Sequence, residues 1–154
     1  MVIRRDSEQS YTMSRPDASA LTPTDDTTGL DPIEALSALD DTTRANIIGT
    51  IVGHSKGSPS KKELEYYNPS VAASTLTDHL NRLEEAGLIE VVERPREGLE
   101  RGQPYRFFQL TDAARELFDR NNIFEPDAYR ALFAEVETTG EIEAAEAVKR
   151  PDGR

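Results

Sequence analysis

The sequence predicts a mainly α-helical protein with one two-stranded antiparallel sheet, an α+β fold that carries extra helices at its ends. Apolar residues recur at helical spacing in several separate segments. Two short runs rich in β-branched or aromatic residues are joined by a glycine-containing loop, and capping residues mark most helix starts. At 154 residues, the chain has room for one small domain with tails.

The first two predicted helices begin at clear capping signals. Asp31-Pro32-Ile33-Glu34 combines an acidic N-cap, a proline at the first helical position and a glutamate at the third. A second helix is expected from Asp41-Thr42, with Lys56-Gly57-Ser58-Pro59 ending it. These helices should supply part of the core.

Residues 1–29 have a different composition. They are rich in Ser, Thr, Asp and Pro and show no apolar periodicity, so we expect a disordered arm. Met13 lies within it and is an alternative start to Met1.

Two helices separated by a short turn follow. Ser60-Lys61-Lys62-Glu63 is a capping box that begins a short helix through Tyr67. Asn68-Pro69-Ser70 makes the turn, and we expect Ser70 to cap a helix over residues 71–86. Gly87 suits the left-handed conformation that often ends a helix.

Two strands and two further helices complete the predicted order. Strands are expected at residues 88–94 and 105–110, and the loop between them contains Gly98 and Gly102. Further helices should begin at Thr111-Asp112 and at Glu125-Pro126-Asp127. From these signals we expect a core domain at 30–120, a dimerisation helix within 121–138 and a flexible acidic tail at 139–154.

Three segments carry motifs in a fixed order. Leu39–Arg44 is LDDTTR, Ser74–Ile89 is STLTDHLNRLEEAGLI, and Phe108–Leu117 is FQLTDAAREL. They resemble the motifs of the ArsR and MarR winged helix-turn-helix regulators over about residues 31–120. The resemblance implies a transcription regulator that binds double-stranded DNA. Ala113-Ala114 departs from the usual glycine, and the ArsR metal-binding cysteines are absent.

The polar face of the 71–86 helix is the candidate reading surface. A helix in the major groove reads base edges with short polar or forked side chains, and arginine suits a narrow minor groove. Leu76, Leu80 and Leu83 share the opposite, apolar face. The predicted DNA contacts are Ser70, Ser74, Thr75, Thr77, Asp78, Asn81 and Arg82, with Lys61 and Lys62 before the turn and Arg94, Arg96 and Arg101 in the strand-joining wing.

An apolar stripe near the C-terminus predicts a homodimer. Specific DNA sites usually need two half-sites, and regulators of this type pair through terminal helices. We expect an antiparallel contact between copies of the chain, made by Ile123, Phe124, Tyr129, Leu132, Phe133 and Val136, assisted by Ile33 and Leu36.

The net charge of −11 is unusual for a DNA-binding protein, which normally carries a basic patch. An acid-rich surface with only four lysines resembles proteins of salt-loving archaea. At ~1 M salt the Debye length is about 3 Å, so scattered carboxylates would barely repel phosphate. The alternative is a winged-helix module that binds another protein and not DNA.

Several function classes find no support in the sequence. The chain has no cysteine and two histidines, His54 and His79, so neither thiolate nor histidine-rich metal sites are expected, and no cofactor is predicted. We find no nucleophile–base pair and no phosphate-binding glycine loop, so an enzyme is not expected. Without a signal peptide or membrane span, we expect a cytoplasmic protein. Its effector and operator are not identified.

Overall fold

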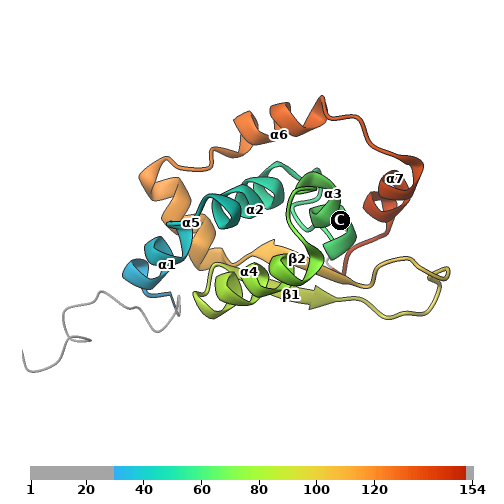
Figure 1. Ribbon diagram of the computed structural model, residues 1–154, viewed down its shortest axis with the longest axis horizontal. Coiled ribbons are helices and arrows are strands. Elements are labelled where there is room, and N and C mark those ends of the chain that lie inside the picture. Colours follow the sequence, from blue (N-terminus) through green and yellow to red (C-terminus); the bar gives the residue numbers. More distant parts are fainter. Residues whose placement is uncertain (1–29, 152–154) are drawn as a thin grey trace, which may run out of the picture.

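The computed structural model describes residues 30–151. The predicted arm at 1–29, with the choice between Met1 and Met13, lies outside these residues. Figure 1 shows three layers: α4 and the sheet lie on one side of the central helix α2, and α6 lies on the other. The face that carries α4 is therefore separated from the face that carries α6.

Helices α1 (Pro32–Leu39) and α2 (Thr42–Gly53) begin where their capping signals predict. The carboxylates of Asp31 and Asp41 accept hydrogen bonds from the backbone N–H groups of Ile33 and Arg44, each at 3.0 Å. All residues from 47 to 53 of α2 are buried. A helix buried on every side forms the centre of a core, and here α1, α4 and α6 surround it.

Helices α3 (Lys61–Tyr67) and α4 (Ala73–Glu85) form the helix–turn–helix. The capping box at the start of α3 is present, with Ser60 and Glu63 each bonding the other's backbone N–H. Helix α4 begins later than predicted, because Ser70 does not cap it. Its N-cap is Ala72, which offers no side-chain acceptor.

Strands β1 (Ile89–Glu93) and β2 (Arg106–Leu110) pair in antiparallel register from Ile89 with Leu110 to Glu93 with Arg106. The backbone N–H of Phe108 also donates to the carbonyl of Pro59, which fixes the sheet to the segment before α3. The loop between the strands projects beyond the body of the protein (Figure 1). The predicted hairpin is confirmed.

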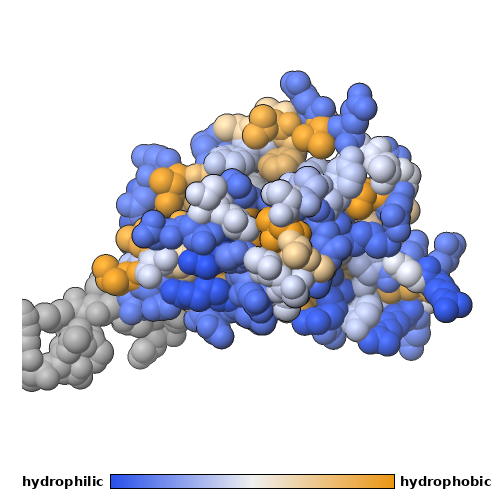
Figure 2. Space-filling model, viewed as in Figure 1, coloured by the Kyte–Doolittle hydropathy of each residue, from blue (hydrophilic) through white to orange (hydrophobic). Residues whose placement is uncertain are grey.

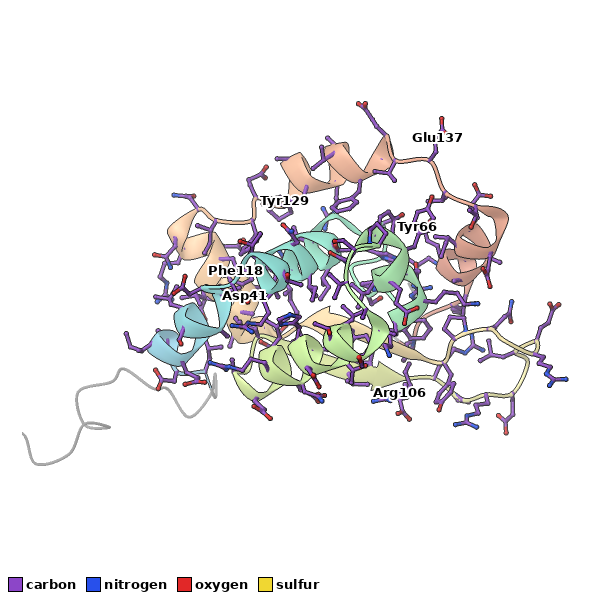
Figure 3. All side chains as sticks on the ribbon, viewed as in Figure 1. Asp41, Tyr66, Arg106, Phe118, Tyr129 and Glu137 are labelled. Carbon is purple, nitrogen blue, oxygen red and sulfur yellow. The ribbon has the colours of Figure 1, made fainter. Side chains whose placement is uncertain are left out.

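Helices α5 (Asp112–Asn121) and α6 (Pro126–Ala134) follow, capped by Thr111 and Glu125 as predicted. Helix α6 lies against α2 of the same chain, where Tyr129 meets Gly49 and Phe133 meets Gly53. Figure 3 shows Tyr129 between these two helices.

The apolar stripe predicted for a dimer is therefore divided. Its inner part packs within the protomer, since Ile123, Phe124 and Tyr129 contact the core and Phe133 contacts α2. Its outer part remains exposed, with Leu132 at 65% and Val136 at 41%. Ile33 and Leu36 on α1 are exposed too. Tight packing of α6 on the glycines of α2 explains the division.

The prediction of a flexible tail at 139–154 is wrong for the segment up to Arg150. Residues Gly140–Ala147 form helix α7, capped by the hydroxyl of Thr139. Ile142, Ala145 and Val148 are buried, and Arg150 is 2% exposed. These few apolar residues make too short a pattern to stand out in the sequence, but the helix that carries them packs against α3.

Within residues 30–151, no helix has the length and apolar character needed to cross a membrane.

Candidate nucleic-acid interface

The outer face of α4 is held in place by a row of leucines on its inner face. Leu76, Leu80 and Leu83 are buried to 3% exposure or less. Because side chains three and four positions apart share one face of a helix, this row orients the polar residues outward. Figure 1 shows α4 along one edge of the protein, beside the sheet and its projecting loop.

Four predicted reading residues are exposed on α4 with their hydrogen-bonding groups unused. Ser74, Thr75, Asp78 and Asn81 make no side-chain hydrogen bond or ion pair to any residue between 30 and 151. Thr77 is half-buried, and its hydroxyl donates to the carbonyl of Ala73 at 3.1 Å. The free groups therefore lie in the first two and a half turns of the helix.

Arg82 and His79 lie on the sides of α4 and connect it to other helices. The Arg82 guanidinium forms an ion pair with Glu34 of α1 at 2.8 Å. Nδ1 of His79 lies 3.3 Å from Nη1 of Arg44, whose Nε donates to the carbonyl of Ala38. His79 thus has a structural contact, and Arg82 is drawn towards α1 and away from the outer face.

The predicted lysines at the start of α3 are paired as well. Lys61 lies 3.8 Å from Glu65. Lys62 forms an ion pair with Glu141 of α7 at 3.1 Å and donates to the carbonyl of Gly102 at 3.4 Å. Lys62 therefore links α3 to both the hairpin loop and α7.

The arginines of the hairpin differ in how they are held. Arg94 donates to the carbonyl of Lys149 at 2.9 Å, and Arg96 stacks on the Tyr105 ring at 4.0 Å while bonding its hydroxyl. Arg101 is exposed at the loop tip. Of the six lysines and arginines predicted to contact DNA, all in the described part of the chain, Arg101 is the one without a hydrogen bond or ion pair.

Comparison with known proteins supports the fold. No family model and no curated protein matches the chain. A similar solved structure is described as "a protein with a GntR superfamily winged-helix-turn-helix domain from Halomicrobium mukohataei"; it is 23% identical and covers 90% of each chain with a TM-score of 0.73. The fold is a winged helix-turn-helix.

The winged helix-turn-helix assignment sharpens the sequence interpretation in two ways. The comparison supports the winged helix-turn-helix part of the predicted resemblance, while the finer resemblance to ArsR and MarR stays a prediction. The similarity also covers more of the chain than residues 30–120 contain, so it is not confined to the predicted core domain.

A buried ionic network, which the sequence did not reveal, anchors the C-terminal segment to the winged helix-turn-helix. Glu63 accepts from Nε2 of His54 at 2.6 Å and from Arg150 at 2.8 Å. Arg150 also donates to the carbonyl of Ser58 and lies over the ring of Phe107, 4.3 Å from its centroid. The capping box at Ser60 and Glu63 is recognisable in the sequence, but the hydrogen bond that Glu63 also accepts from Arg150 is not.

The charge states in this network follow from its hydrogen bonds. Burial would raise the pKa of Glu63, but its hydrogen bond with His54, the backbone N–H of Ser60 and the charge of Arg150 together hold that pKa below its ordinary value. The backbone N–H of Lys56 donates to Nδ1 of His54, so Nε2 carries the proton of the neutral ring. The described residues contain no cluster of acids and histidines suited to a metal ion.

Proposed function

We propose that this protein is a transcription regulator that binds double-stranded DNA, with α4 in the major groove and the wing near the adjacent minor groove. The observation that carries the proposal is the outer face of α4, where Ser74, Thr75, Asp78 and Asn81 are exposed and unpaired above a buried row of leucines. Groups of this kind match the donors and acceptors of base edges. The role is regulatory and not enzymatic.

The N-terminal turns of α4 are the part best suited to reading. Because α4 has no side-chain cap, its first backbone N–H groups can donate to a DNA phosphate, and the helix dipole favours that contact. Ser70 is exposed in the turn just before them. Glu84 and Glu85 at the far end would repel phosphate, so the C-terminal turn should stay away from the backbone.

We propose that attraction between the overall charge of the protein and the DNA phosphates contributes little to binding. Five of the six lysines and arginines predicted to contact DNA form hydrogen bonds or ion pairs within the chain, so few are free to neutralise phosphates. The salt dependence of DNA binding scales with the number of phosphates neutralised. We therefore propose binding that persists in concentrated KCl, in keeping with the acidic composition and with the haloarchaeal source of the similar structure.

Asn81→Ala should weaken binding to the operator by roughly 5- to 150-fold, since a paired base contact contributes about 1–3 kcal/mol of discrimination. Arg101→Ala should lower the slope of log K against log salt by about 1 on every sequence. Fluorescence anisotropy on fragments selected from genomic DNA, from low to molar KCl, measures both effects. Asn121→Ala on α5 is the matched control and should bind as wild type. A folded protein that binds no fragment at any salt concentration contradicts the proposal.

A protein-binding module is the second candidate, favoured by the net charge of −11 and by the internal pairing of the predicted contacts. The two functions separate in the same experiment. A module that only binds protein would show no sequence preference among DNA fragments, and Asn81→Ala would have no effect on its residual DNA binding.

We further propose that the protein acts as a homodimer. The contact between the two copies would be made by the part of the predicted apolar stripe that stays exposed in the protomer. Leu132 and Val136 on α6 are uncovered in the protomer, as are Ile33 and Leu36 on α1. Figure 2 shows hydrophobic colour at the surface over α6 and, separately, over α1. Because the patches are separate, we assign the dimer contact to α6, in an antiparallel arrangement.

Leu132→Asp should convert the dimer to a monomer, because an unpaired carboxylate in an apolar contact is costly. Size-exclusion chromatography with light scattering measures the mass. Ile33→Asp tests α1 separately and should leave the dimer intact. A wild-type protein that is monomeric at every concentration contradicts the dimer.

A further inference from the structure

A cavity of about 540 Å³ lies beside the C-terminal end of α2. Its walls come from the end of α2, from α3, from α6 with the linker that follows, and from α7. Tyr66 of α3 holds that linker, donating from its hydroxyl to the carbonyl of Glu137 at 2.6 Å (Figure 3). The cavity is within the 300–1,000 Å³ range typical of small-molecule sites.

Helix α6 covers this region and packs closely on α2. It has no buried residue, and it meets α2 mainly through Tyr129 on Gly49 and Phe133 on Gly53. Phe133 and Tyr67 pack edge to face with ring centroids 5.3 Å apart. A smaller cavity of about 210 Å³ lies beside the same two rings. The rings of Phe133 and Tyr67 therefore leave aromatic surface under α6 that is not buried in the core.

Two carboxylates of α7 line the large cavity, that of Glu146 half-buried and that of Glu143 exposed. Glu146 accepts from the hydroxyl of Ser55, and Glu143 accepts from the hydroxyl of Thr138 at 3.3 Å. Neither lies within ion-pair distance of a cation in the described part of the chain, although the charge of Lys56 acts on Glu146 at longer range. Arg130 also lines the cavity; it is 54% exposed, and its guanidinium lies 3.9 Å from Asp127.

Two further titratable groups, Tyr67 and His54, line the cavity. Burial raises the pKa of the Tyr67 phenol, and the charges of Glu146 and Glu63 raise it further. Both ring nitrogens of His54 are occupied, one by Glu63 and one by the backbone of Lys56. Aromatic faces beside carboxylates are the combination that attracts organic ammonium groups.

We propose that the cavity between α2, α3, α6 and α7 is an effector site for a small organic cation, whose ammonium group faces Glu143 and Glu146 and whose apolar part lies against Tyr67 and Phe133. The site lies within one protomer. It goes beyond DNA binding, and its ligand can be measured with no DNA present.

The site is connected to the wing through α7. Glu141 of α7 holds Lys62, which also bonds the loop carbonyl of Gly102, and the carbonyl of Lys149 holds Arg94. A ligand that pulls Glu143 and Glu146 inward would act on the same helix that supports these wing contacts. This connection would give an effector a physical route to the DNA-binding face.

Isothermal titration calorimetry of the full chain at low KCl, where screening is least, tests the site. The probes are choline, its uncharged carbon isostere dimethylbutanol, putrescine and glutarate. We expect saturable binding of choline or putrescine and none of dimethylbutanol or glutarate. Glu146→Gln should weaken the binding of putrescine at least about tenfold, since a hydrogen bond to a charged group contributes about 1.5–3 kcal/mol.

Glu141→Gln is the matched control, because it removes a carboxylate from the same helix outside the cavity and should bind as wild type. Glu143→Gln replaces Glu146→Gln if thermal unfolding shows that the latter does not fold. The proposal is overturned if dimethylbutanol binds as well as choline, if glutarate binds in place of the cations, or if neither cation binds at millimolar concentration. None of these results bears on the DNA proposal.

Discussion

Replacing Arg150 with methionine is expected to lower the free energy of unfolding by about 3–5 kcal/mol, because it leaves the carboxylate of Glu63 buried without its cation. Methionine keeps apolar contact with Phe107, so the loss comes from charge and hydrogen bonding. The wild-type guanidinium bonds Glu63, the carbonyl of Ser58 and three carbonyls at the end of α7. Urea denaturation followed by circular dichroism measures the change.

Lys149→Met is the matched control for this variant. It removes a positive charge from the adjacent, exposed residue while its backbone carbonyl still accepts from Arg94. A surface change of this kind normally alters stability by less than about 0.5 kcal/mol. If Arg150→Met and Lys149→Met destabilise the protein equally, the buried network does not hold the C-terminal segment.

The same network predicts how stability depends on pH. The pKa of Glu63 is lower in the folded protein than in the unfolded chain, so its contribution is complete above the ordinary glutamate pKa. It is lost as the pH falls from that value through the lowered one. Arg150 is one of the groups that lower this pKa, so Arg150→Met should lose less stability than wild type over that acid range in denaturation curves.

Helix boundaries were predictable wherever a local signal sets them. Asp31, Asp41, Thr111 and Glu125 each accept a hydrogen bond from a backbone N–H within three residues, and the capping box at Ser60 does the same. Such signals need no knowledge of the fold. Ser70 is a capping residue by type, but it lies in the turn and does not cap α4. The predicted start of α4 was therefore too early.

The outward-facing residues of α4 were predictable from periodicity, but the ion pairs made by the charged residues around them were not. Ser74, Asp78 and Asn81 face outward because Leu76, Leu80 and Leu83 face inward. The partners of Arg82 and Lys62 are Glu34 and Glu141, which are far away in the sequence. Only the tertiary structure brings these ions together, so the number of free cations could not be counted from the sequence.

Helix α7 was missed for a related reason. Its buried side chains are few, and Arg150 enters the interior only because Glu63 is already buried there. A charged residue in a polar, acidic segment normally indicates solvent exposure. The burial depends on a partner from another part of the chain, and no local pattern encodes it.

Two glycines four residues apart in the buried helix α2, Gly49 and Gly53, allow α6 to pack closely on it. Gly53→Ala is expected to destabilise the protein by about 1–3 kcal/mol or to displace α6, because the packed site cannot accept a methyl group. An added Cβ would lie 2.0 Å from the ring of Phe133 and 2.8 Å from the backbone carbonyl oxygen of Tyr129. A flexible side chain could move away, but the helix backbone cannot do so without leaving α2.

Gly140→Ala is the control for this substitution, since an added Cβ there meets nothing within 4 Å. Gly49→Ala should be milder than Gly53→Ala, because its nearest contact is the Tyr129 ring at 2.9 Å and no backbone atom is close. Urea denaturation ranks the three variants, and near-ultraviolet circular dichroism reports the packing of the aromatic side chains, Tyr129 among them. A Gly53→Ala protein as stable as Gly140→Ala, with an unchanged aromatic signal, would show that α6 does not depend on close contact with α2. The cavity beneath α6 would then lack the fixed cover that the effector proposal gives it.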